Sequence, residues 1–223
     1  MQFNLRLVTG ISDKTDDPEE FIGAIVISHL QELQEAKLRK IPFLQVMGSV
    51  FGTEAWDRVS YNNKAIGSLA AQHFFKLGKK RVAVMAQPAD LLLERKDAYI
   101  HACENLRLVL IETPLDIQSA LKFSTDPQNQ IEAVFTCDDN LLLQLCTVLH
   151  FQNLVPMKDL TVLGCNAMTS ILDQIKPTPH SINLHGESIA RIALNQLLLR
   201  RQYPDLPITH IQLCPSLALP QAI

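Results

Sequence analysis

Short apolar runs alternate along this chain with longer stretches of helical periodicity, and this alternation restricts the possible folds more than any other feature. The runs are rich in Val, Ile and Phe and cover residues 23–27, 41–46, 81–85, 133–136 and 160–164. They are nearly continuous, without strict alternation of apolar and polar residues. Such runs are typical of strands buried on both faces, as in a parallel sheet that helices cover.

The stretches between these runs have the spacing of amphipathic helices. We predict helices over residues 63–77, 90–106 and 138–151, and another that begins near residue 186. In the first of these, one apolar stripe is formed by Ile66, Leu69, Ala70, Phe74 and Leu77. Strands that alternate with helices form βαβ units with a parallel sheet and right-handed crossovers, so the predicted fold class is α/β.

The composition excludes several classes of protein. The formal net charge is -3, from 20 basic and 23 acidic side chains, and it supplies no basic face for phosphate backbones. The N-terminus, MQFNLRLVTG, lacks the regions of a signal peptide, and no run of about 18 apolar residues is present to span a membrane. The five cysteines are scattered and odd in number, which fits a reducing compartment, so we expect a cytoplasmic protein.

Motifs of common enzymes are missing from the sequence. No GxGxxG follows a strand, and neither GxxxxGK[ST] nor GxSxG occurs. The seven histidines never have HxxxH or HExxH spacing, which argues against a local zinc pair. We therefore expect a protein that is not an enzyme, with no catalytic residues, no cofactor and no metal.

A series of landmarks follows from Asn62 onward. They are NN(x)3G(x)2A at residues 62–70, LGKKRVAV at 77–84, RKDAY at 95–99, EAVFTCDD at 132–139, VP(x)2DLTVLGCN at 155–166, SIN at 181–183 with Gly186 and Ala190, and CPSL at 214–217. Their order and spacing over roughly residues 40–220 resemble the effector-binding domain of the LacI/GalR family of transcription regulators.

The resemblance implies two Rossmann-like lobes with parallel sheets flanked by helices, in the type I periplasmic-binding-protein-like arrangement. We expect an N-terminal lobe of residues 1–86 plus 183–205 and a C-terminal lobe of residues 87–182 plus 206–223. Residues 1–7 are similar to the family's second strand, so the first strand and helix are expected to be missing. The DNA-binding helix-turn-helix is likewise expected to lie outside this chain.

The resemblance also implies partners. They are a small polar ligand in the cleft between the lobes, a second copy of the chain in a homodimer, and operator DNA, bound only through the upstream helix-turn-helix. Closure of the lobes on a sugar- or nucleoside-like ligand would bias operator binding. Alternatives are a solute-binding transport protein, an enzyme on a doubly wound fold, and a degenerate sensor that serves only for dimerisation.

Three polar residues follow predicted strands, where ligands of open α/β sheets bind. The guanidinium of Arg95 can hold hydroxyls, a carboxylate or a phosphate, unless it is a surface arginine paired with Glu94 or Asp97. The carboxylate of Asp139 can accept hydrogen bonds from hydroxyls, unless it or Asp138 only caps the following helix.

Asn166 stands where the resemblance implies an Asp that holds a polar ligand. Its neutral amide favours an anionic or neutral ligand over a cationic one, unless it caps a helix over residues 167–175. Two further candidates precede the first predicted helix. Asn62 caps that helix and is a candidate for ligand contact. Trp56, in a loop, either stacks on the ligand or packs in the core.

Overall fold

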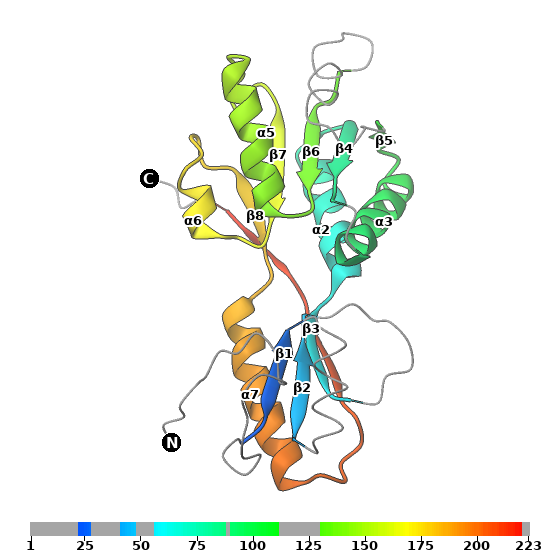
Figure 1. Ribbon diagram of the computed structural model, residues 1–223. Coiled ribbons are helices and arrows are strands. Elements are labelled where there is room, and N and C mark those ends of the chain that lie inside the picture. The colour runs from blue at the N-terminus through cyan, green and yellow to red at the C-terminus, as the bar shows by residue number, and fades with distance from the viewer. Residues whose placement is uncertain (1–21, 28–40, 48–55, 88–89, 112–129, 220–223) are drawn as a thin grey trace. The chain divides into compact units, whose positions relative to one another are not determined.

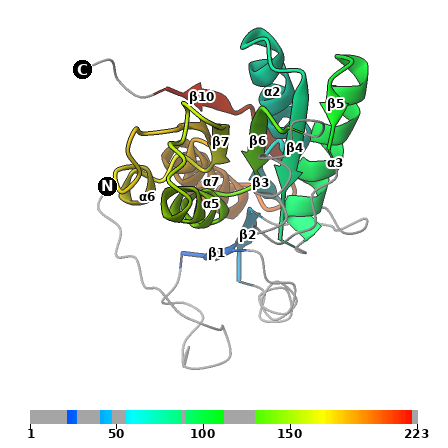
Figure 2. The ribbon, with the colours of Figure 1, turned by 90° about the horizontal axis from the view of Figure 1, so that it is seen from above.

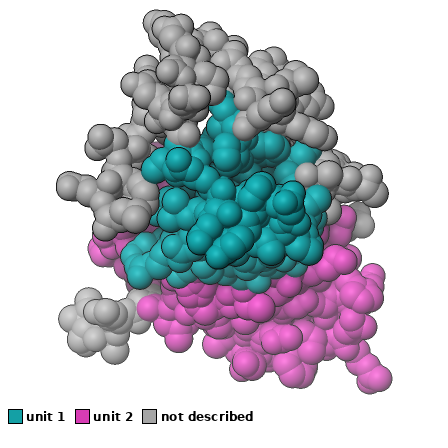
Figure 3. Space-filling model, turned by 90° about the horizontal axis from the view of Figure 1, so that it is seen from below, with its two compact units in different colours: residues 1–60, 186–213 teal, residues 61–185, 214–223 magenta. Residues whose placement is uncertain are grey.

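The chain forms two compact units in a computed structural model, which describes residues 22–27, 41–47, 56–87, 90–111 and 130–219. The first unit comprises Met1–Ser60 and Gly186–Leu213, and the second comprises Tyr61–His185 and Cys214–Ile223 (Figure 3). The chain therefore crosses between the units more than once, and each unit combines segments that are far apart in the sequence.

The first unit contains a four-stranded sheet in the order β1-β2-β3-β9. Its strands are β1 (Ala24–Ile27), β2 (Phe43–Val46), β3 (Arg58–Tyr61) and β9 (His210–Leu213). The pairs β1–β2 and β2–β3 are parallel, as the apolar runs predict. The helix α7 (Gly186–Gln202) packs against β1 and β2 (Figure 1).

One ion pair fastens the end of α7 to the sheet of the first unit. Arg200 donates to the buried carboxylate of Asp57 from Nε at 2.7 Å and from Nη2 at 2.9 Å. The backbone N–H of Thr209 donates to the same carboxylate at 2.8 Å. Burial alone would raise the pKa of Asp57, but the hydrogen bonds from Arg200 and Thr209 lower it below its ordinary value. Asp57 therefore holds Arg200 and the start of β9 in place.

The second unit contains a six-stranded sheet in the order β10-β8-β7-β6-β4-β5. Its strands are β4 (Arg81–Met85), β5 (Val109–Leu110), β6 (Ala133–Thr136), β7 (Thr161–Cys165), β8 (His180–Asn183) and β10 (Ser216–Ala218). Neighbouring strands are parallel except for β10, which is antiparallel to β8. The apolar runs at residues 81–85, 133–136 and 160–164 form the centre of this sheet, as predicted.

Helices cover both faces of this sheet. They are α2 (Asn63–Lys76), α3 (Asp90–Asn105), α5 (Asp139–Phe151) and the short α6 (Thr169–Leu172). Val134 of β6 packs in a buried apolar cluster with residues of α5 and α6. On the other face, the ring of Phe135 lies 5.2 Å from the ring of Tyr99 in α3, which in turn lies 6.4 Å from that of Phe74 in α2. Figure 2 shows α5 and α6 on one side of the strands and α2 and α3 on the other.

The lobe boundaries expected from the sequence are wrong in three places, the smallest being residues 183–185, which belong to the second unit. Residues 61–86 belong to the second unit, because α2 packs along α3 and β4 lies between β5 and β6 in the six-stranded sheet. Residues 206–213 belong to the first unit, because β9 lies beside β3. The strand expected over residues 1–7 lies outside the described residues.

The sequence patterns missed several short strands. The strands β3, β5, β8, β9 and β10 are each only two to four residues long, and α6 is shorter than the helix considered over residues 167–175. Segments this short contain too few residues for a periodicity to appear. None of the helices in the described part of the chain is long and apolar enough to cross a membrane.

Gly67 allows the closest approach between α2 and α3. An ideal Cβ at this position would lie 2.5 Å from the carbonyl oxygen of Arg95 and 2.5 Å from the backbone nitrogen of Tyr99. Both atoms belong to the backbone of α3 and cannot move independently of that helix. Only glycine therefore fits at this contact between the two helices.

We expect Gly67→Ala to lower the free energy of unfolding by about 1–3 kcal/mol, because an extra methyl group in a close-packed contact costs about this much. Urea denaturation followed by circular dichroism measures the change. The matched control is Gly186→Ala, where an added Cβ meets no atom within 4 Å. If Gly67→Ala were as stable as the control, α2 and α3 would not be in the contact described.

Candidate ligand-binding site

A cluster of polar residues lies at the carboxyl ends of three adjacent strands in the second unit. The chain continues from β4 to β5 on one side of β4, and then crosses to β6, β7 and β8 on the other side. The point between β4 and β6 is therefore a topological switch point, where open α/β sheets bind ligands. The residues that follow β4, β6 and β7 supply the cluster.

Arg95 is the centre of this cluster and is only 2% exposed. Its Nε donates to the side-chain oxygen of Asn63 at 2.8 Å, and its Nη1 donates to the carbonyl oxygen of Cys137 at 2.7 Å. Nη1 also lies 3.4 Å from Sγ of Cys165 and 3.5 Å from the side-chain oxygen of Asn166. The alternative of a surface arginine is therefore wrong, because the guanidinium connects α3 to the residues at the ends of β6 and β7.

Two neighbours orient this guanidinium. Asn63, one turn before Gly67 in α2, receives the Nε hydrogen bond and donates from Nδ2 to Glu94 at 2.8 Å. The aromatic ring of Tyr61 lies 4.7 Å from Cζ of Arg95, within the range of a cation–π contact. The close packing at Gly67 thus brings Asn63 within reach of Arg95. Neither Asn63 nor Tyr61 has a spacing in the sequence that marks a role beside Arg95.

Asn166 lies in an unusual backbone conformation beside the guanidinium. Its φ is 115° and that of Ala167 is 52°, both in the region that non-glycine residues rarely adopt. Its backbone N–H donates to the carbonyl of Ile182 at 2.9 Å, which fastens the turn to β8. The cap of α6 is Met168, so the alternative role of Asn166 as a helix cap is wrong. Strain of this kind is concentrated at functional sites and persists only where the surroundings enforce it.

Asp139 holds the turn that contains Asn166. Its carboxylate accepts from the backbone N–H of Met168 at 2.7 Å and from the hydroxyl of Ser181 at 2.8 Å, and the residue is fully buried. A Cβ at Gly164 would lie 2.2 Å from its Oδ1, so glycine is needed there. Both oxygens are therefore engaged within the protein. The helix cap of α5 is Asp138, which accepts from two backbone N–H groups.

Burial raises the pKa of Asp139 from 3.8 to about 6, and the hydrogen bonds from Met168 and Ser181 limit the rise. Burial likewise raises the pKa of the Cys165 thiol to about 12 and that of the Cys137 thiol further. Both thiols are therefore protonated at neutral pH. Arg95 carries the positive charge at the centre of the cluster.

The structure brings Arg95, Asn166 and Asp139 together in the second unit, and it places the other two candidates differently. Asn62 caps α2, because its side-chain oxygen accepts from the backbone N–H of Ala65 at 2.9 Å, as expected. Trp56 belongs to the first unit, where its ring lies 6.1 Å from that of Phe43.

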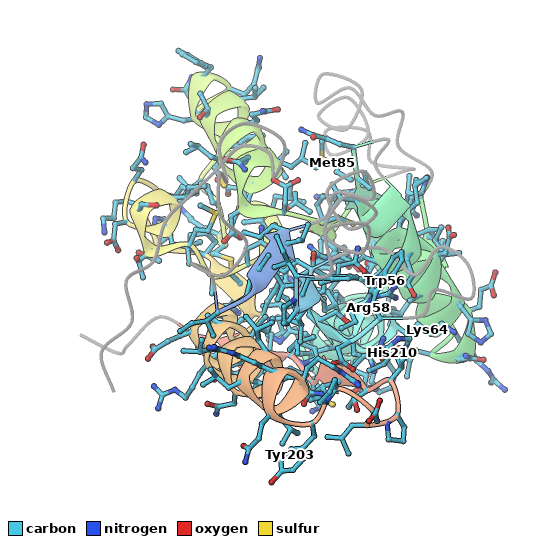
Figure 4. All side chains as sticks on the ribbon, turned by 60° about the horizontal axis from the view of Figure 1, so that its bottom comes forward. Trp56, Arg58, Lys64, Met85, Tyr203 and His210 are labelled. Carbon is cyan, nitrogen blue, oxygen red and sulfur yellow. The ribbon has the colours of Figure 1, made fainter. Side chains whose placement is uncertain are left out.

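Trp56 and Arg58, labelled in Figure 4, both donate to the side-chain oxygen of Gln45, at 3.3 Å and 2.8 Å. Trp56 also lines a hollow of about 470 Å³ whose described lining belongs entirely to the first unit. Its contacts are those of a packing residue, which was one of the two roles expected for it. In the described part of the chain, no three His, Cys, Asp or Glu side chains form a group that could hold a metal ion.

Comparison with known proteins identifies the family and the fold of the chain. The model of the periplasmic binding protein-like domain family matches residues 71–219. The chain belongs to this family. Among curated proteins, none matches the sequence.

Solved structures show the same fold. A regulatory protein of the LacI family from Chloroflexus aggregans superposes with a TM-score of 0.76 at 18% identity, over 89% of this chain and 75% of that one. A LacI family transcriptional regulator from Enterococcus faecium with bound ribose gives 0.70 at 19% identity, over 90% and 79%. The CelR transcriptional regulator in complex with cellobiose gives 0.71 at 18% identity, over 88% and 64%. The predicted type I periplasmic-binding-protein-like fold of LacI regulators is thereby confirmed.

The raised pKa of Asp139 predicts a pH dependence of stability. Because the folded chain binds this proton more tightly than the unfolded chain, the stabilisation is complete below about pH 4 and is lost as the pH rises through about 6. The rise from 3.8 to about 6 corresponds to about 3 kcal/mol. We expect Asp139→Asn, which keeps the shape and removes the charge, to gain up to this amount relative to wild type between pH 4 and 7.

Urea unfolding midpoints at several pH values measure this difference, with Asp173→Asn, at an exposed carboxylate, as the control. The difference between variant and wild type is needed because a second group acts in the opposite direction. Nε2 of His73 lies 2.9 Å from Nδ1 of His180, and burial lowers the pKa of His73 to about 4. The contribution of His73 to the free energy of unfolding is therefore lost as the pH falls. Parallel pH profiles for Asp139→Asn and wild type would contradict the account of Asp139.

Proposed function

We propose that this chain is the effector-sensing domain of a LacI-type transcription regulator. It binds a small polar ligand, sugar- or nucleoside-like, at the carboxyl ends of β4, β6 and β7. Arg95 and Asn166 contact the ligand. Asp139 and Asn63 position these two residues, and Asn62 starts the helix that carries Asn63. Trp56 remains a candidate for ligand contact, although its packing against Phe43 gives it a role in the first unit.

The observation that carries this proposal is the buried guanidinium of Arg95 at a topological switch point. A purely structural arginine is usually neutralised by a carboxylate or lies at the surface, whereas Arg95 is buried and forms no ion pair with any described carboxylate. Relatives of the same fold have been solved with bound ribose and cellobiose, which supports a hydroxylated ligand.

The regulatory part of the proposal follows from the same resemblance. The protein is a cytoplasmic homodimer without catalytic activity, and ligand closure of its lobes changes the affinity of an upstream helix-turn-helix for operator DNA. The coupling free energy between ligand and DNA in such regulators is typically about 1–3 kcal/mol.

A thermal-shift screen of neutral sugars, sugar phosphates, nucleosides and purines tests the ligand site. A ligand at about 100 times its Kd stabilises a protein by about 2.7 kcal/mol, which corresponds to a rise in Tm of about 5–10 °C for a chain of this size. We expect Arg95→Met to abolish the shift, because losing a buried charged donor costs about 2–5 kcal/mol of binding. The matched control Arg191→Ala, at an exposed arginine of α7, keeps it.

A degenerate sensor is the second candidate, and the engagement of both Asp139 oxygens within the protein favours it. In that case the lobes serve only for dimerisation and no compound class raises the Tm. A shift that persists in Arg95→Met would instead exclude Arg95 from the site.

A further inference from the structure

No described carboxylate forms a direct ion pair with the guanidinium of Arg95. The described groups around its guanidinium are the side-chain oxygens of Asn63 and Asn166, the carbonyl oxygen of Cys137, Sγ of Cys165 and the ring of Tyr61. All of these groups are neutral, because the raised pKa of the thiol keeps Cys165 protonated.

The nearest acidic residues are engaged elsewhere. Glu94 accepts from Asn63, Asp138 caps α5, and Asp139 accepts from Met168 and Ser181. A buried charge without a counter-ion is costly, because water and an opposite charge are both missing. These carboxylates keep their charges near the guanidinium, but none of the described ones forms a direct ion pair with Arg95.

Arg200 shows how the same chain neutralises another arginine. In the first unit it forms a two-pronged ion pair with Asp57, through bonds of 2.7 Å and 2.9 Å, and its Nη1 and Nη2 also donate to backbone carbonyls. The carboxylate and the carbonyls together satisfy the whole fork. The guanidinium of Arg95 also donates to a backbone carbonyl and to an amide oxygen, but no described carboxylate forms an ion pair with it.

Nη2 of Arg95 makes none of the short hydrogen bonds of the fork. The hydrogen bonds to described residues within 3.5 Å use Nε and Nη1. The side chain of Tyr61 is a further hydrogen-bond partner of the guanidinium, and Nη2 is not among the fully buried nitrogens that lack a partner. The Nδ2 donors of Asn166 have no acceptor among the described residues. Both side chains thus offer hydrogen-bond donors beside a positive charge.

We propose that the ligand of this site carries an anionic group, a phosphate or a carboxylate, which forms an ion pair with Arg95. This inference rests on the proposed function, since it names the chemistry of the ligand at the same site. A guanidinium edge matches the spacing of two anionic oxygens. The anion forms the direct ion pair that no described carboxylate supplies, and the amide of Asn166 donates to it.

Asn166 sets the preference of the site for an anionic ligand. A carboxylate at this position would lie beside Nη1, where the amide oxygen now lies at 3.5 Å, and would neutralise Arg95 from within the protein. Asn166→Asp is therefore expected to change the preference from anionic to neutral ligands. Both Asn and Asp tolerate positive φ better than most residues, so the variant is expected to fold.

Isothermal titration calorimetry with matched probes tests this inference. The probes are ribose and ribose 5-phosphate, glucose and glucose 6-phosphate, gluconate, and inorganic phosphate alone. We expect at least one sugar anion to bind about tenfold or more tightly than its neutral partner and than inorganic phosphate, as charge-assisted hydrogen bonds predict. Asn166→Asp should lose this preference by a similar factor, whereas Asn166→Ser, without a charge, should keep it.

The outcomes separate the inference from the proposed function. Neutral sugars that bind as tightly as their anions would overturn the inference and leave the sensor function in place. Inorganic phosphate that binds as tightly as the sugar phosphates would overturn it as well, because the sugar would then contribute nothing. If neither the anions nor the neutral members of the wider screen bind, the proposed function itself fails.

Discussion

The guanidinium of Arg95 is the point at which the separate elements of the second unit meet. It lies on α3, receives its orientation from Asn63 on α2, and donates to the residues that end β6 and β7. Its position depends on the contact at Gly67, which lets α2 and α3 approach at the backbone of Arg95 itself. Packing between two helices therefore fixes the geometry of a polar group at the strand ends.

A second set of contacts fixes the other side of the cluster. The buried carboxylate of Asp139 accepts from the N–H of Met168 and from the hydroxyl of Ser181, and Asn166 and Ala167, both with positive φ, directly precede Met168. Asn166 is kept in this conformation by its own backbone hydrogen bond to Ile182 and by the hydrogen bonds of its neighbours Ala167 and Met168. Asp139 acts here as a positioning residue, which separates it from Arg95 and Asn166 although all three follow strands.

Part of this structure could be predicted from the sequence. Continuous apolar runs identified β1 and β2 in the first sheet and the central strands β4, β6 and β7 in the second, and Asn62 identified the start of α2. Strand-end positions identified Arg95, Asp139 and Asn166, because a parallel sheet collects its carboxyl ends at one edge. The lobe boundaries could not be predicted, since they depend on whether α2 packs on α3 or elsewhere, which is a tertiary property.

The roles within the cluster also lay beyond the sequence. Asp138 and Asp139 are adjacent and chemically alike, and only the direction of each side chain decides that one caps α5 and the other holds the next turn. Asn62 and Asn63 are also adjacent and chemically alike, but Asn62 caps α2 whereas Asn63 accepts from Arg95 on α3. That no described carboxylate pairs directly with Arg95 became clear only from the contacts of its guanidinium.

The most direct measurement is nuclear magnetic resonance of the protein labelled with ¹⁵N-arginine and titrated with ribose 5-phosphate, glucose 6-phosphate and gluconate. The side-chain signal of Arg95 is assigned by its absence in Arg95→Met. The account predicts that a bound sugar anion moves this signal to a new position and leaves that of Arg200 unchanged. A ligand that raises the Tm while the Arg95 signal stays in place would contradict it.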